Sequence, residues 1–178
     1  MSLPRIFLIG PMGSGKTTVG RFLARRLGLE FRDLDQEIER RCGVEVSTIF
    51  DIEGEAGFRK REHVMLEELT RADSLLLATG GGSILRADNR ALLRERGLVV
   101  WLRTRVDQQI RRLEKDQRRP LLQAPDREQR LLEMAETRDP LYAECAHLIV
   151  PSDNVSPMQM AQRAARQIQR HLESEQVS

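Results

Sequence analysis

The sequence predicts an α/β protein of three layers, in which helices cover both faces of a five-stranded parallel sheet. Short apolar runs bounded by glycine or proline alternate with helical stretches along the whole chain. Each run is apolar almost throughout, which is typical of parallel strands buried on both faces. The 178 residues, 40% hydrophobic and 31% charged, have the size and composition of one globular unit. We therefore expect one domain over residues 1–178.

The expected elements follow from apolar periodicity and from the positions of glycine and proline. Ser47 is expected to cap a helical turn ahead of the third helix, and Pro140 to halt the sixth. The expected strands are Arg5–Gly10, Glu30–Leu34, Leu75–Thr79, Leu98–Leu102 and His147–Val150. The expected helices are Lys16–Leu27, Gln36–Cys42, Phe58–Thr70, Asn89–Arg96, Val106–Lys115, Arg127–Thr137 and Pro157–Leu172.

Charge and cysteine content argue against several classes of protein. The 29 basic and 27 acidic residues leave a net charge of +2, which is weak support for nucleic-acid binding. The apolar runs are far shorter than the roughly 20 residues that span a bilayer, and Ile6–Gly10 is too short for a signal-peptide core. Cys42 and Cys145 are too few for a disulfide framework or a zinc site. We expect a monomeric cytoplasmic protein that binds neither nucleic acid nor membrane.

A phosphate-binding motif follows the first expected strand. Residues 10–17, Gly-Pro-Met-Gly-Ser-Gly-Lys-Thr, fit G-x-x-x-x-G-K-[ST] and open a helix. The glycines let backbone N–H groups face a phosphate chain, at the positive end of the helix dipole. Lys16 offers a cation to the β- and γ-phosphates, and the Thr17 hydroxyl can ligate Mg²⁺. We expect a P-loop NTPase fold that binds ATP through Gly13, Ser14, Gly15, Lys16, Thr17 and Thr18; the alternative is a glycine-rich turn with a lysine at a helix start.

The motif leaves the phosphoryl acceptor open between water and a small molecule. A GTPase switch would carry N-K-x-D, and none of the three lysines lies in that context. The D-x-x-G match at Asp51–Gly54 has two wild cards and is weak.

Two carboxylates follow the second expected strand. Asp33 and Asp35 are at i and i+2 and can face the same side, toward the crevice at the carboxyl ends of the strands. One can hold the water shell of magnesium while the other takes the proton of an attacking hydroxyl. The alternatives are an N-cap for the helix Gln36–Cys42 at Asp35 and a solvated loop end at Asp33.

Three other features point to an anionic acceptor. Gly80–Gly82 follow the third strand, where a ligand can touch backbone closely. Arg59 is expected at a helix start, where a cation is unfavourable to the dipole unless it meets an anion. Arg138 is expected just past a helix. The alternatives are a flexible turn, a solvated arginine and a cap on helical carbonyls.

Taken together, these residues resemble the shikimate kinase family, small P-loop kinases of the nucleoside-monophosphate-kinase type. The resemblance runs from about Ile6 to the last helix. The matching segments are residues 10–17, Asp33–Asp35 with Ile38 and Glu39, Phe58–Arg59, Gly80–Gly82, Arg119–Leu122 and Arg138–Tyr142.

The resemblance implies ATP-dependent phosphorylation of the 3-hydroxyl of shikimate, with Mg²⁺. Asp35 would hold the shikimate hydroxyls and act as base, within a substrate-binding segment of about 33–62. Arg59 and Arg138 would clamp the carboxylate, and Gly81 and Gly82 would give backbone contacts. Lys16 and Arg119, the latter on a lid of about 114–125, would reach the transferring phosphate. Thr17, and Asp33 through water, would order magnesium, and adenine would lie near Arg112 and Pro157.

Two matters stay open in this interpretation. The loop Ser152–Pro157 lacks an arginine that some family members place there, so either Arg111 or Arg112 can stack on the base. The alternatives in function are a related kinase acting on gluconate and a non-catalytic nucleotide-binding module.

Overall fold

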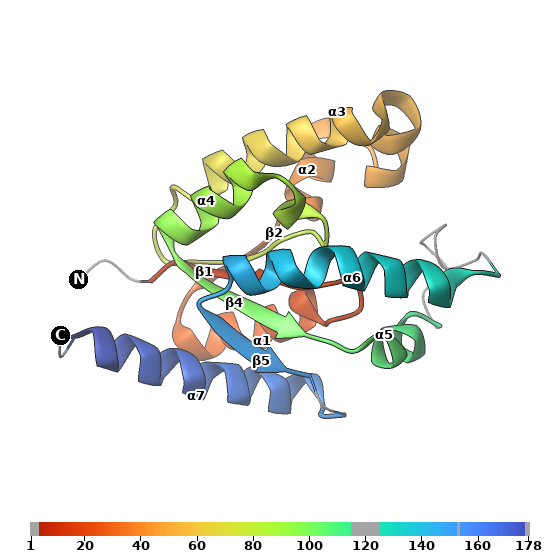
Figure 1. Cartoon of the computed structure of the whole chain (residues 1–178). Helices are drawn as coiled ribbons and strands as arrows, with labels where there is room; N and C mark the ends of the chain where they lie inside the picture. The colour runs from red at the N-terminus through yellow and green to blue at the C-terminus, as the bar shows by residue number, and fades with distance from the viewer. Residues whose placement is uncertain (1–3, 115–124, 153, 177–178) are drawn as a thin grey trace.

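The protein was analysed as a computed structural model that describes residues 4–114, 125–152 and 154–176. The described residues form a five-stranded sheet with the order β2-β3-β1-β4-β5, in which every neighbouring pair is parallel. Helices cover both faces, so the predicted three-layer α/β architecture is confirmed (Figure 1). The strands are β1 Ile6–Ile9, β2 Glu30–Asp33, β3 Leu75–Ala78, β4 Leu98–Arg103 and β5 Leu148–Pro151.

The three inner strands carry the apolar runs that the sequence predicted to be buried. Phe7 on β1 lies in register with Leu77 on β3 and Val99 on β4, and all three side chains are fully buried. The edge strand β5 differs from the expected buried strand, because Ile149 is 43% exposed. His147 precedes β5, and its Nδ1 accepts a hydrogen bond from the Val99 N–H at 2.9 Å.

Two apolar clusters join the layers. One unites a face of the sheet with the first and last helices. The other unites the opposite face with four helices and includes Trp101, Met65, Leu66 and Leu69. A short 3₁₀ helix, η1 Ser83–Leu85, follows β3. The first face carries α1 Lys16–Leu27 and α7 Pro157–Gln176; the second carries α2 Leu34–Cys42, α3 Val46–Leu69, α4 Ala87–Arg96 and α6 Arg127–Cys145; α5 is Val106–Leu113 (Figure 1).

The third helix begins earlier than predicted. It starts at Val46 after Glu45 in the N-cap position, so Ser47 does not cap a separate turn. The helical conformation of α3 is interrupted at Gly54, whose φ of 70° and ψ of −177° are accessible almost only to glycine. Arg59 therefore lies five residues into the second half of α3, and its expected place at a helix start is wrong.

The sixth helix does not end at Pro140. It continues to Cys145, because Tyr142 and Cys145 are buried in the apolar cluster beneath the helix. Pro140 and Glu136, whose carbonyl loses its N–H partner, are both exposed, and water can satisfy that carbonyl. Arg138 consequently lies inside α6, so the alternative of a cap on terminal carbonyls is wrong.

Candidate active site

The phosphate loop connects β1 to α1 and leaves the helix N-terminus open. Gly15 occupies the N-cap position with a φ of 85°, a left-handed conformation that disfavours other residues. The first turn of α1 contains no acidic side chain. Its amide N–H groups and dipole therefore favour an anion at this end of the helix.

Lys16 places a positive charge within this loop. Its ammonium donates hydrogen bonds to the Gly10 carbonyl at 2.6 Å and to the Pro11 carbonyl at 2.8 Å. The Ser14 hydroxyl oxygen lies 3.4 Å from the same nitrogen. A lysine fixed among loop carbonyls is a structured part of the loop, which argues against a generic glycine-rich turn.

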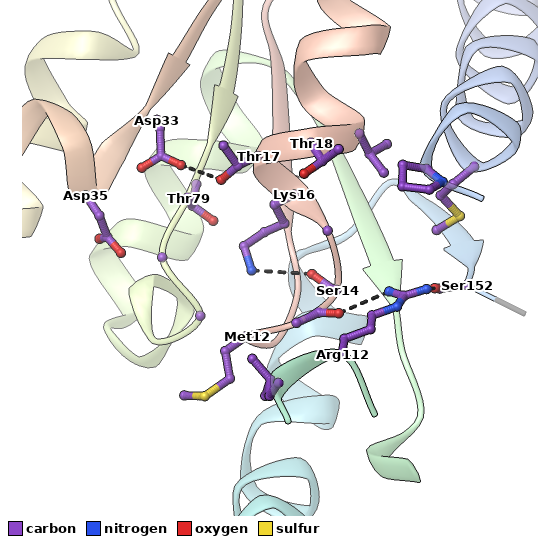
Figure 2. A pocket seen from close by; sticks show the side chains of 18 of the residues that line it. Met12, Ser14, Lys16, Thr17, Thr18, Asp33, Asp35, Thr79, Arg112 and Ser152 are labelled. Atoms are coloured by element: carbon purple, nitrogen blue, oxygen red, sulfur yellow. Dashed lines mark hydrogen bonds between the residues drawn. The ribbon is translucent and has the colours of Figure 1, made fainter. Parts of the chain in front are cut away.

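A cavity of about 530 Å³ opens at the carboxyl ends of the strands, as the sequence predicted (Figure 2). This volume falls in the usual range for small-ligand sites. Figure 2 shows Thr17, Asp33 and Asp35 toward one side of Lys16, and Arg112 with Ser152 toward the other. The lining residues are Met12–Val19, Asp33, Asp35, Thr79–Gly81, Arg112, Leu113, Ser152, Val155, Pro157 and Met160.

Asp33 has two hydrogen-bonding partners at the edge of this cavity. Its Oδ1 accepts from the Gln36 N–H at 3.1 Å, and its Oδ2 accepts from the Thr17 hydroxyl at 2.7 Å. Asp33 is thus the N-cap of α2, and the alternatives that gave the cap to Asp35 and a solvated end to Asp33 are wrong. Asp35 lies in the first turn of α2 and lines the cavity.

The Gly80–Gly82 turn is packed between charged side chains. A Cβ on Gly80 would lie 3.2 Å from the Asp35 Oδ1, and a Cβ on Gly81 would lie 3.6 Å from the Arg138 Nη1. A Cβ on Gly82 would come within 2.2 Å of the Arg59 Nη2. The structure thus brings three predicted acceptor-site side chains to one turn, and a side chain at Gly82 would collide with the Arg59 guanidinium.

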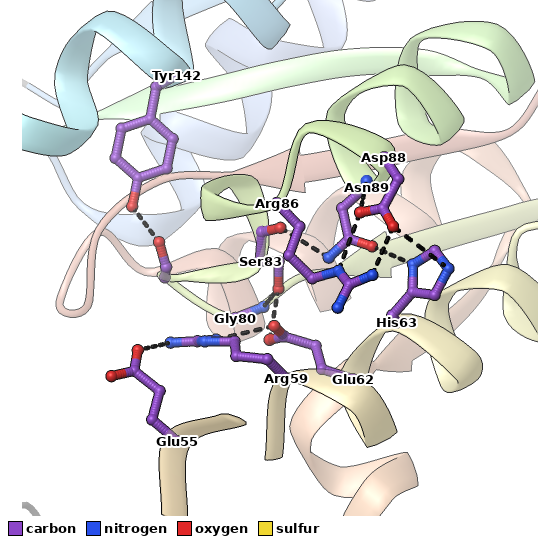
Figure 3. Close-up of polar contacts among 11 residues, drawn as sticks. Glu55, Arg59, Glu62, His63, Gly80, Ser83, Arg86, Asp88, Asn89 and Tyr142 are labelled. Atoms are coloured by element: carbon purple, nitrogen blue, oxygen red, sulfur yellow. Dashed lines mark hydrogen bonds and ion pairs between the residues drawn. The ribbon is translucent and has the colours of Figure 1, made fainter. Parts of the chain in front are cut away.

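Glu62 is a site residue that the sequence analysis missed. It is fully buried, its Oε1 accepts from the Arg59 Nη1 at 2.8 Å, and its Oε2 accepts from the Ser83 hydroxyl at 2.8 Å (Figure 3). The Arg59 Nε is also buried and donates to no acceptor among the described residues. The signal was available, because a carboxylate three residues after Arg59 lies on the same face of a helix.

The two neighbouring arginines on α5 point to different places. Arg112 donates to the Gly13 carbonyl at 3.0 Å and to the Ser152 hydroxyl at 2.7 Å, and burial lowers the pKa of its guanidinium. Arg111 is exposed and lies 3.7 Å from Asp107. Arg112 is therefore the one that faces the cavity; Ser152, which the sequence analysis gave no role, anchors it.

Arg119 and most of the segment expected to form a lid lie outside the described residues. The flanking residues are described, and the Arg127 guanidinium lies 3.3 Å from the Glu114 carboxylate.

Among the described residues there is no cluster of three or more His, Cys, Asp or Glu side chains suited to hold a metal ion. None of the helices that the structure describes has the length and apolar character of a membrane-spanning segment.

A parallel α/β sheet with a phosphate loop beside a carboxylate and an arginine-flanked turn defines a P-loop kinase of small molecules. The family model described as "Shikimate kinase" matches residues 12–169. The chain is 52% identical to the shikimate kinase of Chromohalobacter salexigens, over 94% of this chain and 93% of that protein. The solved structure titled shikimate kinase from Acinetobacter baumannii in complex with shikimate superposes with a TM-score of 0.91 at 50% identity, covering 95% and 94% of the two chains.

The chain therefore belongs to the shikimate kinase family, as its resemblance predicted, and is an enzyme of that family. A gluconokinase from Sinorhizobium meliloti covers 99% of this chain with a TM-score of 0.63 but is 18% identical, so that likeness concerns the fold alone.

Proposed function

We propose that this kinase transfers the γ-phosphoryl group of ATP to the 3-hydroxyl of shikimate, giving ADP and shikimate 3-phosphate. One observation carries the proposal: the phosphate loop, Asp35 and a turn flanked by two guanidiniums meet in one place. Such a site holds a phosphoryl donor next to an alcohol whose molecule also carries a carboxylate. The family membership and the solved relative, whose title names bound shikimate, support the same acceptor.

At the donor end, the amides of residues 13–18 would bind the triphosphate. Lys16 would stabilise the charge that develops on the transferring phosphoryl group, because its ammonium already lies within the loop. Arg112 would lie against adenine together with Pro157, since both line the cavity and Figure 2 shows Arg112 on the side away from Asp35. Arg119 is also assigned to the transferring phosphate; this assignment rests on the sequence match.

Magnesium would be held by the Thr17 hydroxyl directly and by Asp33 through water. The two side chains fit such an ion, because their oxygens lie 2.7 Å apart and oxygen ligands are what Mg²⁺ prefers. The remaining ligands would come from ATP and water, as is usual where protein carboxylates are few. Bound there, Mg²⁺ supplies positive charge to the phosphate oxygens.

At the acceptor end, Asp35 would accept the proton of the 3-hydroxyl as the new P–O bond forms. The buried Arg59 Nε is a donor that lacks an acceptor among the described groups, and a substrate carboxylate would satisfy it. Arg138, whose Nη1 lies near Gly81, would bind the same carboxylate, and Gly81 and Gly82 would contribute backbone N–H groups. Glu62 would hold the Arg59 fork in place.

The test is an acceptor screen with the purified chain, ATP and Mg²⁺. ADP release is measured with shikimate, with gluconate and with nucleoside monophosphates, and the product is identified by ³¹P NMR. Only shikimate should give acceptor-dependent ADP and a phosphate monoester. Comparable turnover of gluconate would favour the gluconate-type alternative, and ATP binding without turnover of any acceptor would favour a non-catalytic module.

A further inference from the structure

Tyr142 lies behind the acceptor site, and its hydroxyl has a specific partner there. The side chain is 1% exposed, and the hydroxyl donates a hydrogen bond of 2.5 Å to the Gly81 carbonyl (Figure 3). The ring stacks on Trp101 of β4 with centroids 5.5 Å apart and an interplanar angle of 27°. Because the ring is held by the sheet, the hydroxyl meets the turn at a fixed position.

This contact sets the direction of one peptide unit. In a trans peptide the C=O of Gly81 and the N–H of Gly82 point in opposite directions. Holding the carbonyl toward α6 therefore turns the Gly82 N–H away from α6. That amide donates to no protein group in the described part of the chain, whereas the Gly80 N–H donates to the Ser83 hydroxyl.

The other side of the turn is where Arg59 lies. Figure 3 shows Tyr142 on one side of the turn and Arg59 with Glu62 on the other. The Arg59 Nη2 occupies the space that a side chain on Gly82 would fill. The Gly82 amide and the Arg59 guanidinium therefore lie side by side, as two donors for one acidic group.

The Tyr142 hydroxyl is also influenced by the second arginine of the turn, Arg138. Arg138 precedes Tyr142 by four residues on α6, so the two share a helix face, and the positive charge of the guanidinium acts on the tyrosine hydroxyl. Burial raises the pKa of Tyr142, an effect that the nearby Arg138 and Arg59 cations only partly oppose. The hydroxyl thus stays a protonated donor throughout the pH range in which the enzyme is assayed.

We infer that Tyr142 is a positioning residue for the acceptor: its hydroxyl fixes the Gly81 carbonyl so that the Gly82 amide is presented beside Arg59 to the substrate carboxylate. The inference rests on the proposed function, because it names the acceptor as the ligand. The role belongs to the oxygen atom, whereas the ring contributes to the apolar core.

The test is Tyr142→Phe, which deletes the oxygen and keeps the ring. Calorimetric titration should show shikimate bound roughly 3- to 30-fold more weakly, the range expected for one lost buried hydrogen bond. The KM for shikimate should rise by a similar factor, while kcat and the KM for ATP change less than about twofold. Thr70→Val is the matched control, because it removes another buried hydroxyl, bonded to the Leu66 carbonyl at 2.8 Å and outside the cavity lining.

Three outcomes are distinguishable. Weaker shikimate binding in Tyr142→Phe alone supports the positioning role. Unchanged shikimate binding in Tyr142→Phe, or equal weakening in Thr70→Val, overturns this inference and leaves the proposed function standing. Failure of the unsubstituted protein to bind shikimate overturns both.

Discussion

Asp33 and Asp35 are two residues apart, yet they lie in different surroundings, which suit the different roles that we propose for them. Asp33 accepts hydrogen bonds from Thr17 and from the α2 backbone, so its carboxylate is held in a fixed orientation. Asp35 lies farther along the cavity, beside Gly80 of the arginine-flanked turn. In the proposed function, this separation would place a cation-ordering group next to the phosphate loop and a proton acceptor next to the alcohol.

The assignment of Asp35 predicts the behaviour of Asp35→Asn. The amide cannot take the hydroxyl proton, so kcat in the coupled assay should fall at least about 100-fold, the low end of general-base effects. ATP affinity, measured by nucleotide titration, should stay near that of the unsubstituted enzyme. Asp73→Asn changes an exposed carboxylate paired with Arg5 and should leave kcat unaltered. Full activity in Asp35→Asn would remove this residue from the role of base.

Arg138 gives a second prediction, which concerns geometry at constant charge. Arg138→Lys replaces a planar fork by a point cation, which cannot make two parallel hydrogen bonds to a carboxylate. The KM for shikimate should rise about 10-fold or more, a loss of roughly 1.4 kcal/mol or more for one charge-assisted hydrogen bond. Arg130→Lys, on the exposed part of the same helix, is the control. An unchanged KM in Arg138→Lys would mean that the carboxylate is bound elsewhere.

Sequence patterns and the family resemblance named the charged residues of the candidate site, but they missed contacts that join distant parts of the chain. The phosphate loop could be predicted because its glycines, Lys16 and Thr17 act within one turn. The contacts of Ser152 with Arg112, and of Tyr142 with Gly81, join positions 40 and 61 residues apart. No spacing rule reveals such pairs, because the packing of helices on the sheet creates them.

At the level of elements, local rules located every strand and most helices but misjudged two helices. Gly54 interrupts α3 without ending it, and Pro140 leaves α6 intact. In the second case the tertiary contacts of Tyr142 and Cys145 outweigh the local preference of proline. Both corrections bear on the site, because they move Arg59 and Arg138 from helix ends, where they were expected, to helix interiors.

The break in α3 predicts the behaviour of Gly54→Ala. No atom lies within 4 Å of a Cβ on Gly54, so any loss of stability must come from the backbone conformation. That conformation should make the free energy of unfolding lower by roughly 1–3 kcal/mol, measured by urea denaturation. Asp51→Ala, at an exposed position in the same helix, should change the free energy by less than about 0.5 kcal/mol. Equal stability of the two variants would show that α3 straightens without strain.

At the scale of the whole molecule, strand order explains where the site lies. The connection after β1 leads through α1 to β2, at one edge of the sheet. The connection after β3 leads through α4 to β4, in the direction of the opposite edge. These two connections leave adjacent strands in opposite directions and on opposite faces, and a crevice opens between them at the carboxyl ends. The phosphate loop after β1 and the glycine turn after β3 border this crevice, so donor and acceptor groups meet there.

Core burial also predicts how the stability of the whole fold depends on alkaline pH. Burial raises the pKa of the Cys145 thiol to about 11 from an ordinary value near 9, with nearby arginines opposing part of the rise. Because the pKa is higher in the folded state than in the unfolded chain, the protonated thiol contributes to the free energy of unfolding. This contribution is complete below about pH 9 and is lost as pH rises to 11, by up to roughly 2–3 kcal/mol. Tyr142, whose pKa burial also raises, adds a loss of the same sign above pH 10. The free energy of unfolding, measured by urea denaturation under reducing conditions, should therefore fall less steeply between pH 9 and pH 10 in Cys145→Ala than in the unsubstituted protein. Cys42→Ala removes the other, partly exposed thiol and should keep the steep decline of the free energy of unfolding. If this free energy declined equally with pH in the unsubstituted protein and in Cys145→Ala, the buried thiol would ionise as readily in the folded protein as in the unfolded chain.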